Sequence, residues 1–292
     1  MRSRLRTRAT IAALLAAIGA ATWFALAATL QREAPVPREV LLGGGAVGLL
    51  LFLIIGGLAI IEARALRRAE QRMRRFLADA SHELRTPIAG IQASAETLLR
   101  TDPSRCGREN LVLQILREAH RAGRLVDDLL TITRMEQGSQ LTREQFDLVP
   151  VAAAAVEVTR ELAPAVDVLL HAPGHSQLRG DPRRIRQVLD NLLSNARHAT
   201  PDGGQIIVRI SSHADDVQIE VIDTGPGVPQ PDRERIFERF ARLPDSYPGR
   251  PGGNGLGLAI ARGIASAHSG TLTCVDPADH GARFLLRLPR RG

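Results

Sequence analysis

The chain has 292 residues and a net charge of +7, and all of its basic side chains other than histidine are arginines. The lack of lysine excludes a Walker-type phosphate loop, and two distant cysteines, Cys106 and Cys274, exclude a disulfide framework or a zinc cluster. Ten arginines flank two N-terminal apolar runs, which favours a membrane over direct binding of nucleic acid.

The two apolar runs, residues 11–30 and 40–61, are each long enough to cross a bilayer as a helix. Between them, residues 31–39 form a short, neutral outer loop. Arginines precede the first run and follow the second, so we expect a two-span protein of the cell membrane with both termini in the cytoplasm. A cleaved signal peptide is the alternative for the first run, because LAA near its end resembles a cleavage site. Residues 1–62 are therefore predicted to be a membrane region.

Residues 63–140 are predicted to form an antiparallel helical hairpin. Apolar and small residues recur in steps of four and three on both sides of the turn-rich stretch TDPSRCGREN. Two such helices bury their apolar seams well only when a second copy completes a four-helix bundle. The pattern therefore predicts a homodimer.

The stretch SHELRTP carries the candidate reactive group of this hairpin. His82 lies just off the apolar seam and should face solvent, where a histidine is most often merely solvated. Glu83 can accept a hydrogen bond from one ring nitrogen and make the other more nucleophilic, and Thr86 lies one turn further on the same face. Pro87 lacks the N–H that would bond the Glu83 carbonyl, so the helix should bend or loosen there without ending.

Residues 141–292 alternate helix and strand signals and are predicted to form an α+β domain. The run DPRRIRQVLDNLLSNARHAT predicts a helix capped by Asp181, with Asn191 and Asn195 on one face. Their amides could cross-link the structure, or an amide oxygen could bind Mg²⁺, which prefers hard oxygen ligands. The next two β-rich runs, IIVRIS and VQIEVID, predict a hairpin.

The second of these strands ends in DTGPGVP, which has the residues for contacting a purine. Asp223 can accept a hydrogen bond from an adenine amino group, and Gly225 and Gly227 let the backbone approach the base. The same residue types are also typical of a plain turn. Next, RIFERFARL predicts a short helix that places Phe237 and Phe240 in the core.

Residues 241–254 contain many Pro, Gly and polar residues, a composition that predicts a mobile lid. The following GGNGLGLAIARGIASAHSG opens a helix whose N-terminus attracts phosphate, with glycines that allow close approach. It is not the dinucleotide fingerprint, because Ile260 occupies the third glycine position. TLTCVD and ARFLLRLP predict a final hairpin.

SHELRTP resembles the H-box of sensor histidine kinases of bacterial two-component systems, and the resemblance extends over residues 67–290. The order of the later motifs is similar to the α+β sandwich ATP-binding domain shared by histidine kinases, Hsp90-type chaperones, MutL and gyrase. The resemblance implies that His82 accepts a phosphoryl group from ATP and that Glu83 is the general base. Thr86 would position water for dephosphorylating the partner.

The same resemblance implies a nucleotide site with Asn195 as the main Mg²⁺ ligand. The other residues implied at the nucleotide are Asn191, Asp223, Gly225, Gly227, Arg239, Arg242, Gly253, Gly255 and Gly257. His198 stands where the family often has lysine, which departs from the usual phosphate contact. The implied partners are a second copy of the chain and a response regulator with a receiver aspartate.

A stimulus is expected to arrive within the membrane, from lipid stress or an accessory membrane protein, because the outer loop cannot hold a folded ligand domain. Three alternatives remain for the activity. They are a regulator phosphatase with weak kinase activity, a non-catalytic ATP-binding scaffold in the same signalling system, and an ATP-driven chaperone-like machine. The last has no need of SHELRTP.

Overall fold

The structure is a computed structural model. It describes Gly19, Thr29 and residues 38–101, 103–136, 141–172, 174–243, 254–276 and 281–290. Contacts divide the chain into two compact units, Met1–Ala78 and Asp79–Gly292. Within the part that is described, no helix is both long and apolar enough to cross a membrane. Apart from Gly19 and Thr29, the first predicted span lies outside the described residues, and residues 40–61 belong to a longer helix.

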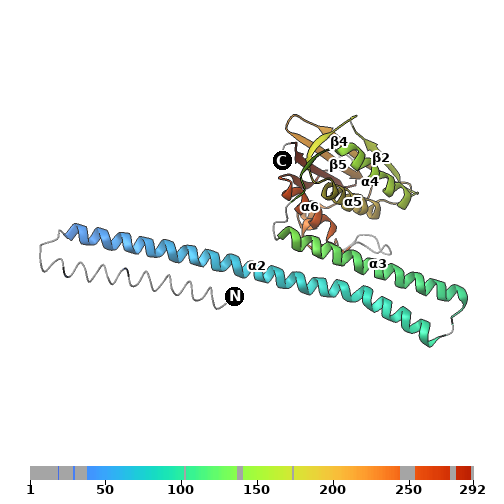
Figure 1. Ribbon diagram of the computed structural model, residues 1–292, viewed down its shortest axis with the longest axis horizontal. Helices are drawn as coiled ribbons and strands as arrows, with labels where there is room; N and C mark the ends of the chain where they lie inside the picture. Colours follow the sequence, from blue (N-terminus) through green and yellow to red (C-terminus); the bar gives the residue numbers. More distant parts are fainter. Residues whose placement is uncertain are drawn as a thin grey trace. The chain divides into compact units, whose positions relative to one another are not determined.

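Two long helices precede the α+β domain, α2 (Arg38–Arg100) and α3 (Arg105–Glu136) (Figure 1). As predicted, α2 continues through Pro87, so this residue does not end the helix. The two helices lie side by side within the second unit, where a Cβ added to Gly90 of α2 would be 3.3 Å from Cγ of Glu118 in α3. The predicted hairpin is therefore present, and we call residues 79–136 of these helices the hairpin.

The α+β domain contains a five-stranded sheet in the order β2-β4-β5-β7-β6 and a two-stranded ribbon of β1 and β3 (Figure 1). The strands are β1 (Glu144–Asp147), β2 (Asp167–His171), β3 (Gln177–Gly180), β4 (Gln205–Ser212), β5 (Asp216–Asp223), β6 (Thr271–Val275) and β7 (Arg283–Pro289). The antiparallel pairs β4–β5 and β6–β7 confirm both predicted hairpins, and β2 joins β4 in parallel.

Three helices pack on one face of this sheet. They are α4 (Leu148–Leu162), α5 (Pro182–Ala199) and α6 (Gly257–Ala267), and α5 lies between the other two. Beneath them, Val208, Val221 and Phe284 form one row across three strands and are completely buried. Burial of such side chains stabilises the layer by about 1.5–3 kcal/mol each. The sheet and its helices make the predicted α+β sandwich, and this core fixes the ends of α5, β5 and α6.

The start of α5 follows the sequence prediction closely. The Asp181 side chain accepts hydrogen bonds from the backbone N–H groups of Arg183 and Arg184, and Pro182 occupies the first helical turn. These bonds satisfy N–H groups that have no partner inside the helix. The cap therefore sets the register that places Asn191 and Asn195 along α5.

The predicted short helix in RIFERFARL was wrong in extent. Only Arg235–Phe237 forms a helical turn, of the 3₁₀ type (η2). Phe240 adopts a φ of +60°, and its N–H donates a 2.8 Å hydrogen bond to the Gly255 carbonyl, so the backbone leaves the helical path. Phe237 lies in the core as expected, whereas Phe240 is only half-buried.

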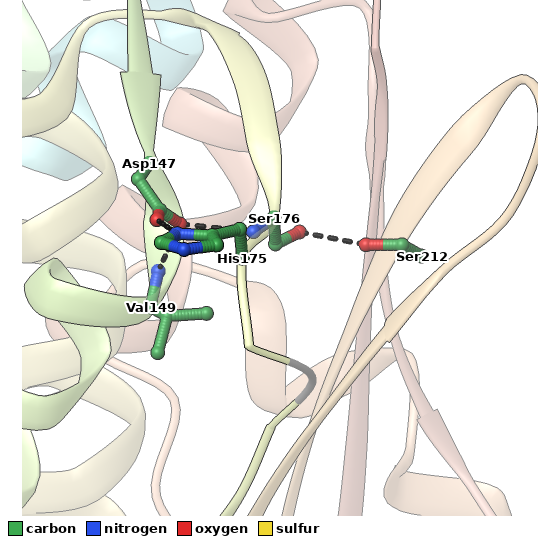
Figure 2. Close-up of polar contacts among 5 residues, drawn as sticks. All are labelled: Asp147, Val149, His175, Ser176 and Ser212. Atoms are coloured by element: carbon green, nitrogen blue, oxygen red, sulfur yellow. Dashed lines mark hydrogen bonds and ion pairs between the residues drawn. The ribbon is translucent and has the colours of Figure 1, made fainter.

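A cluster of Asp, His and Ser residues joins the ribbon to α4 (Figure 2). Asp147 caps α4 and also accepts bonds from the Ser176 N–H and from Nδ1 of His175, at 2.9 and 2.7 Å. These bonds, that of Ser176 first, hold the pKa of Asp147 below its ordinary value. The Ser176 hydroxyl bonds Ser212 at 2.8 Å rather than the His175 ring, so the cluster is a cap and not a nucleophile–base pair.

Candidate nucleotide and phosphoacceptor site

Asp223 ends β5 inside the α+β domain with one carboxylate oxygen lacking a protein partner. Its side chain is 1% exposed, and Oδ1 accepts bonds from the N–H groups of Gly225 and Ala282 at 2.9 and 3.2 Å. Oδ2 is buried and has no hydrogen-bond partner among the described residues. Burial raises the pKa of this carboxyl, and the two backbone bonds oppose the rise. An unsatisfied buried acceptor is costly unless a ligand donates to it.

The loop after Asp223 contains Gly225 and Gly227, and its surroundings leave no room for a side chain at either position. A Cβ at Gly225 would lie 2.7 Å from the Ala199 carbonyl oxygen at the end of α5. Gly227 has a φ of +79°, and a Cβ there would lie 2.5 Å from the carbonyl oxygen of Gly281. The loop is thus pressed between α5 and the chain that enters β7, which keeps the backbone close to the Asp223 carboxylate.

Asn191 connects α5 to the start of α6. Its Oδ1 would be 3.3 Å from a Cβ at Gly257, the first residue of α6, and its Nδ2 is buried without a partner among the described residues. Asn195 lies one turn further along α5 and is half-buried. The structure therefore brings Asn191 and Gly257 together, as the sequence predicted for one site.

The segment before α6 is tightly connected to the loop after η2. Gly255 has a φ of +69°, and a Cβ there would lie 2.8 Å from the Phe240 backbone. Gly253 and most of the predicted lid, residues 244–253, lie outside the described residues. The α6 N-terminus faces α5 rather than open space, because Gly257 contacts Asn191.

In the hairpin, His82 and Thr86 are both exposed on α2, as the sequence predicted for this face of the helix. Glu83 is half-buried, and its carboxylate accepts a 3.2 Å bond from Nη2 of Arg242. No hydrogen bond joins Glu83 to the neighbouring His82 ring in the part of the chain that is described. Two arginines were predicted at the nucleotide. Arg242 contacts the hairpin, and Arg239, in the same segment of the chain, is half-buried.

The sequence prediction missed a second polar contact between the hairpin and the α+β domain. Asn254 Nδ2 donates a 2.7 Å bond to Asp128 of α3, while Asn254 Oδ1 accepts from the Leu256 N–H at 3.2 Å. Burial raises the pKa of Asp128, and the Asn254 bond opposes the rise. Sequence spacing cannot predict a pair 126 residues apart.

A cavity of about 1120 Å³ lies away from all of these residues. It is lined by the end of α3, the chain before β1, the start of α5 and the end of α6, and four arginines contribute to it: Arg134, Arg143, Arg183 and Arg184. Its lining includes none of the predicted site residues, so its size is no argument against the nucleotide site at Asp223.

The residues present fit an adenine nucleotide with Mg²⁺. Asp223 Oδ2 and Asn191 Nδ2 are buried groups that still need an external donor and acceptor. In the described ranges, no group of three or more His, Cys, Asp and Glu side chains is placed to hold a metal ion. A Mg²⁺ ion here would instead be held by nucleotide phosphates and an amide oxygen, a donor set that suits this hard cation.

Two family models match the chain. Residues 72–138 match the His Kinase A (phospho-acceptor) domain, and residues 180–292 match the Histidine kinase-, DNA gyrase B-, and HSP90-like ATPase. The first includes His82, and the second includes every residue predicted at the nucleotide.

The chain is also similar to individual proteins. It is 37% identical to the probable sensor histidine kinase TcrY of Mycobacterium tuberculosis, over 80% of this chain and 49% of that one. Histidine kinase AdeS of Acinetobacter baumannii has a similar structure, with a TM-score of 0.57 and 25% identity over 72% of this chain and 98% of that one. Full-length ShkA in complex with AMPPNP gives a TM-score of 0.57 and 26% identity over 75% of this chain and 46% of that one.

The chain spans about half the length of the curated relatives it matches. The two family models together nevertheless match more than half of it, and they occur in the order that the sequence motifs predicted. The chain therefore belongs to the sensor histidine kinase family.

Proposed function

We propose that this chain is a membrane-bound, homodimeric sensor kinase that phosphorylates His82 with ATP and passes the phosphoryl group to an aspartate of a response regulator. The observation that carries the proposal is an exposed histidine on a hairpin together with a domain in which Oδ2 of the buried Asp223 has no hydrogen-bond partner among the described residues. The first is accessible to a macromolecule, and the second needs a donor of the kind that an adenine amino group supplies.

In the proposed reaction, Glu83 takes the proton from one nitrogen of the His82 ring. The other nitrogen forms a bond to the γ-phosphorus while the bond from that phosphorus to the bridging oxygen breaks, and ADP leaves. Asn191 and Asn195 hold the phosphates from α5, and Arg239 and Arg242 stabilise their charge. Mg²⁺, when bound through Asn195, offsets part of the phosphate charge. The AMPPNP bound in the similar ShkA complex supports a nucleotide as the ligand of this domain.

The membrane location is proposed from the sequence. Residues 11–30 and 40–61 are apolar and are flanked by arginines, which favours two spans with both termini in the cytoplasm. The stimulus would then arrive through the spans, from the lipid or from an accessory membrane protein. Replacing both spans with an unrelated dimeric helix in matching phase should abolish the signal response and keep the kinase activity; a retained response would contradict this part of the proposal.

A test of the kinase reaction uses the full-length chain, ATP labelled at the γ-phosphate, and Mg²⁺. We expect an acid-labile, base-stable label that Asn195→Ala reduces at least about 100-fold, because charge stabilisation of phosphoryl transfer is lost. Ser194→Ala, an exposed neighbour on the same helix, is the matched control and should label normally.

No label on the wild-type chain, with ATP still bound, would favour the second candidate, a regulator phosphatase or an ATP-binding scaffold. Thr86→Ala would then separate the two. It should abolish the loss of phosphate from a phosphorylated regulator if Thr86 positions the attacking water, and should change nothing if the chain is only a scaffold.

A further inference from the structure

Two hairpin carboxylates contact the α+β domain, at one residue that precedes residues 244–253 in the sequence and at one that follows them. Glu83 of α2 pairs with Arg242, and Asp128 of α3 accepts a hydrogen bond from Asn254. A third contact brings Met135 of α3 against α6, since a Cβ at Gly263 would overlap the Met135 methyl group. These two polar contacts and this apolar contact hold the domain against the hairpin.

The first contact occupies two residues that the kinase reaction needs. In the proposed function Glu83 must accept a proton and Arg242 must meet phosphate, yet here each neutralises the other. The Arg242 guanidinium occupies an oxygen of the Glu83 carboxylate that would otherwise be open to accept the proton. In this arrangement neither residue is available for the reaction.

The second contact is built to be reversible. Asp128 is half-buried, and burial raises the pKa of its carboxyl while the Asn254 bond lowers it. Arg124 attracts the ionised carboxylate, and Asp127 repels it. When the contact opens, water can replace the Asn254 amide at the Asp128 carboxylate, so the contact can open without a large penalty.

We propose that Glu83–Arg242 and Asp128–Asn254 form a two-point latch that holds the kinase in a resting state, and that nucleotide phosphate opens it by competing for Arg242. The proposal rests on the proposed function for the roles of Glu83 and Arg242. A triphosphate carries more negative charge than one carboxylate and offers several oxygens to the guanidinium fork, so it can displace Glu83. Binding of the substrate would then release the base.

The test alters Asp128, which has no part in the proposed chemistry. In the full-length chain, Asp128→Ala should increase the initial rate of His82 phosphorylation at ATP concentrations well below the KM about three- to tenfold, the effect of losing one hydrogen bond of ordinary strength. Asp127→Ala removes the same charge from the exposed neighbour and should leave the rate unchanged. Asn254→Ala removes this bond and also the bond to the Leu256 N–H. Added to Asp128→Ala it should therefore give no further increase in the rate, because the bond between the two residues is already absent.

Hydrogen exchange gives a readout that does not depend on kinase activity. The Leu256 N–H bonds Asn254, and the Phe240 N–H bonds the Gly255 carbonyl. Peptides containing these amides should exchange about three- to tenfold faster in Asp128→Ala than in the wild type or in Asp127→Ala. Circular dichroism on each variant separates this local change from unfolding.

The outcomes separate the latch from the kinase assignment. Faster exchange without any label in any variant would support the latch contact and contradict the kinase assignment. Normal labelling with unchanged exchange in Asp128→Ala would overturn the latch and leave the kinase intact. Slower labelling in Asp128→Ala with the fold preserved would also overturn it, because the contact would then belong to the active state.

Discussion

The guanidinium of Arg242 lies 3.2 Å from the carboxylate of Glu83, so the residue expected at a nucleotide phosphate is bonded to the residue expected to act as the base. The two are 159 positions apart in the chain and belong to different domains. Their contact gives each of them a second role in the resting protein.

Replacing Glu83 should therefore slow the phosphorylation of His82 without weakening the affinity for nucleotide. Glu83→Gln should slow phosphorylation of His82 about 100-fold, the usual cost of losing a general base, and should not weaken nucleotide binding, because Arg242 loses a competitor. Single-turnover labelling and nucleotide titration measure the two effects. Glu96→Gln, an exposed glutamate on the same helix, is the control. A parallel loss of affinity would show that Glu83 supports the nucleotide site instead.

Asp223→Asn should separate nucleotide recognition from folding. The asparagine keeps an oxygen for the N–H groups of Gly225 and Ala282 but loses the charged acceptor at Oδ2. We expect ATP affinity to fall about 10- to 100-fold, since hydrogen bonds to a charged group contribute about 1.5–3 kcal/mol. Isothermal titration calorimetry measures the affinity. Unchanged ATP binding would mean that the adenine base lies away from Asp223.

The same substitution has a predictable effect on stability as a function of pH. Burial raises the pKa of Asp223 above its ordinary value of 3.8, so the folded state holds the proton more tightly than the unfolded state does. The carboxyl group therefore favours folding most at pH values below 3.8, and this contribution is lost as the pH rises through the folded-state pKa. Relative to Asp223→Asn, the nucleotide-free wild type should lose stability between pH 4 and neutral pH.

Urea unfolding of the wild type and of Asp223→Asn across that pH range tests the direction in which their difference in unfolding free energy changes with pH. Asp147 should behave in the opposite way, because its pKa is lowered, first by the Ser176 N–H. Its contribution is present above 3.8 and is lost as the pH falls through its folded-state pKa. An Asp223 difference that grows toward acid pH would contradict the burial described here.

Much of the structure around the proposed nucleotide site could be predicted from the sequence because its elements are local. The Asp181 cap, the spacing of Asn191 and Asn195 and the strand that ends at Asp223 depend on neighbouring residues, and all three are present. RIFERFARL was misread because its apolar spacing is helical, whereas Phe240 is held in a left-handed conformation by a bond to distant Gly255. Tertiary contacts override local propensity in such segments.

Two glycines with the same backbone conformation should differ in how well they tolerate alanine. Gly203 has a φ of +80° with no atom within 4 Å of an added Cβ, and Gly227 has a φ of +79° with the Gly281 oxygen only 2.5 Å from it. Gly203→Ala should cost about 1 kcal/mol of unfolding free energy, the backbone strain alone. Gly227→Ala should cost about 3 kcal/mol, because Gly281 must also move.

Chemical denaturation of the two variants without nucleotide makes this comparison. Equal losses would mean that the loop after Asp223 can move away from Gly281. The Gly281 contact itself lay beyond sequence reasoning, as did the Asp128–Asn254 bond. Both contacts join segments far apart in the chain, and hydrophobic periodicity predicts only local secondary structure.

Phosphorylation of His82 is tested by ³¹P NMR of the full-length chain after reaction with ATP and Mg²⁺. We expect a phosphohistidine resonance that is absent in His82→Gln and unchanged in His120→Gln, which alters another exposed histidine of the hairpin. If the resonance persists in His82→Gln, the γ-phosphoryl group is received by another residue.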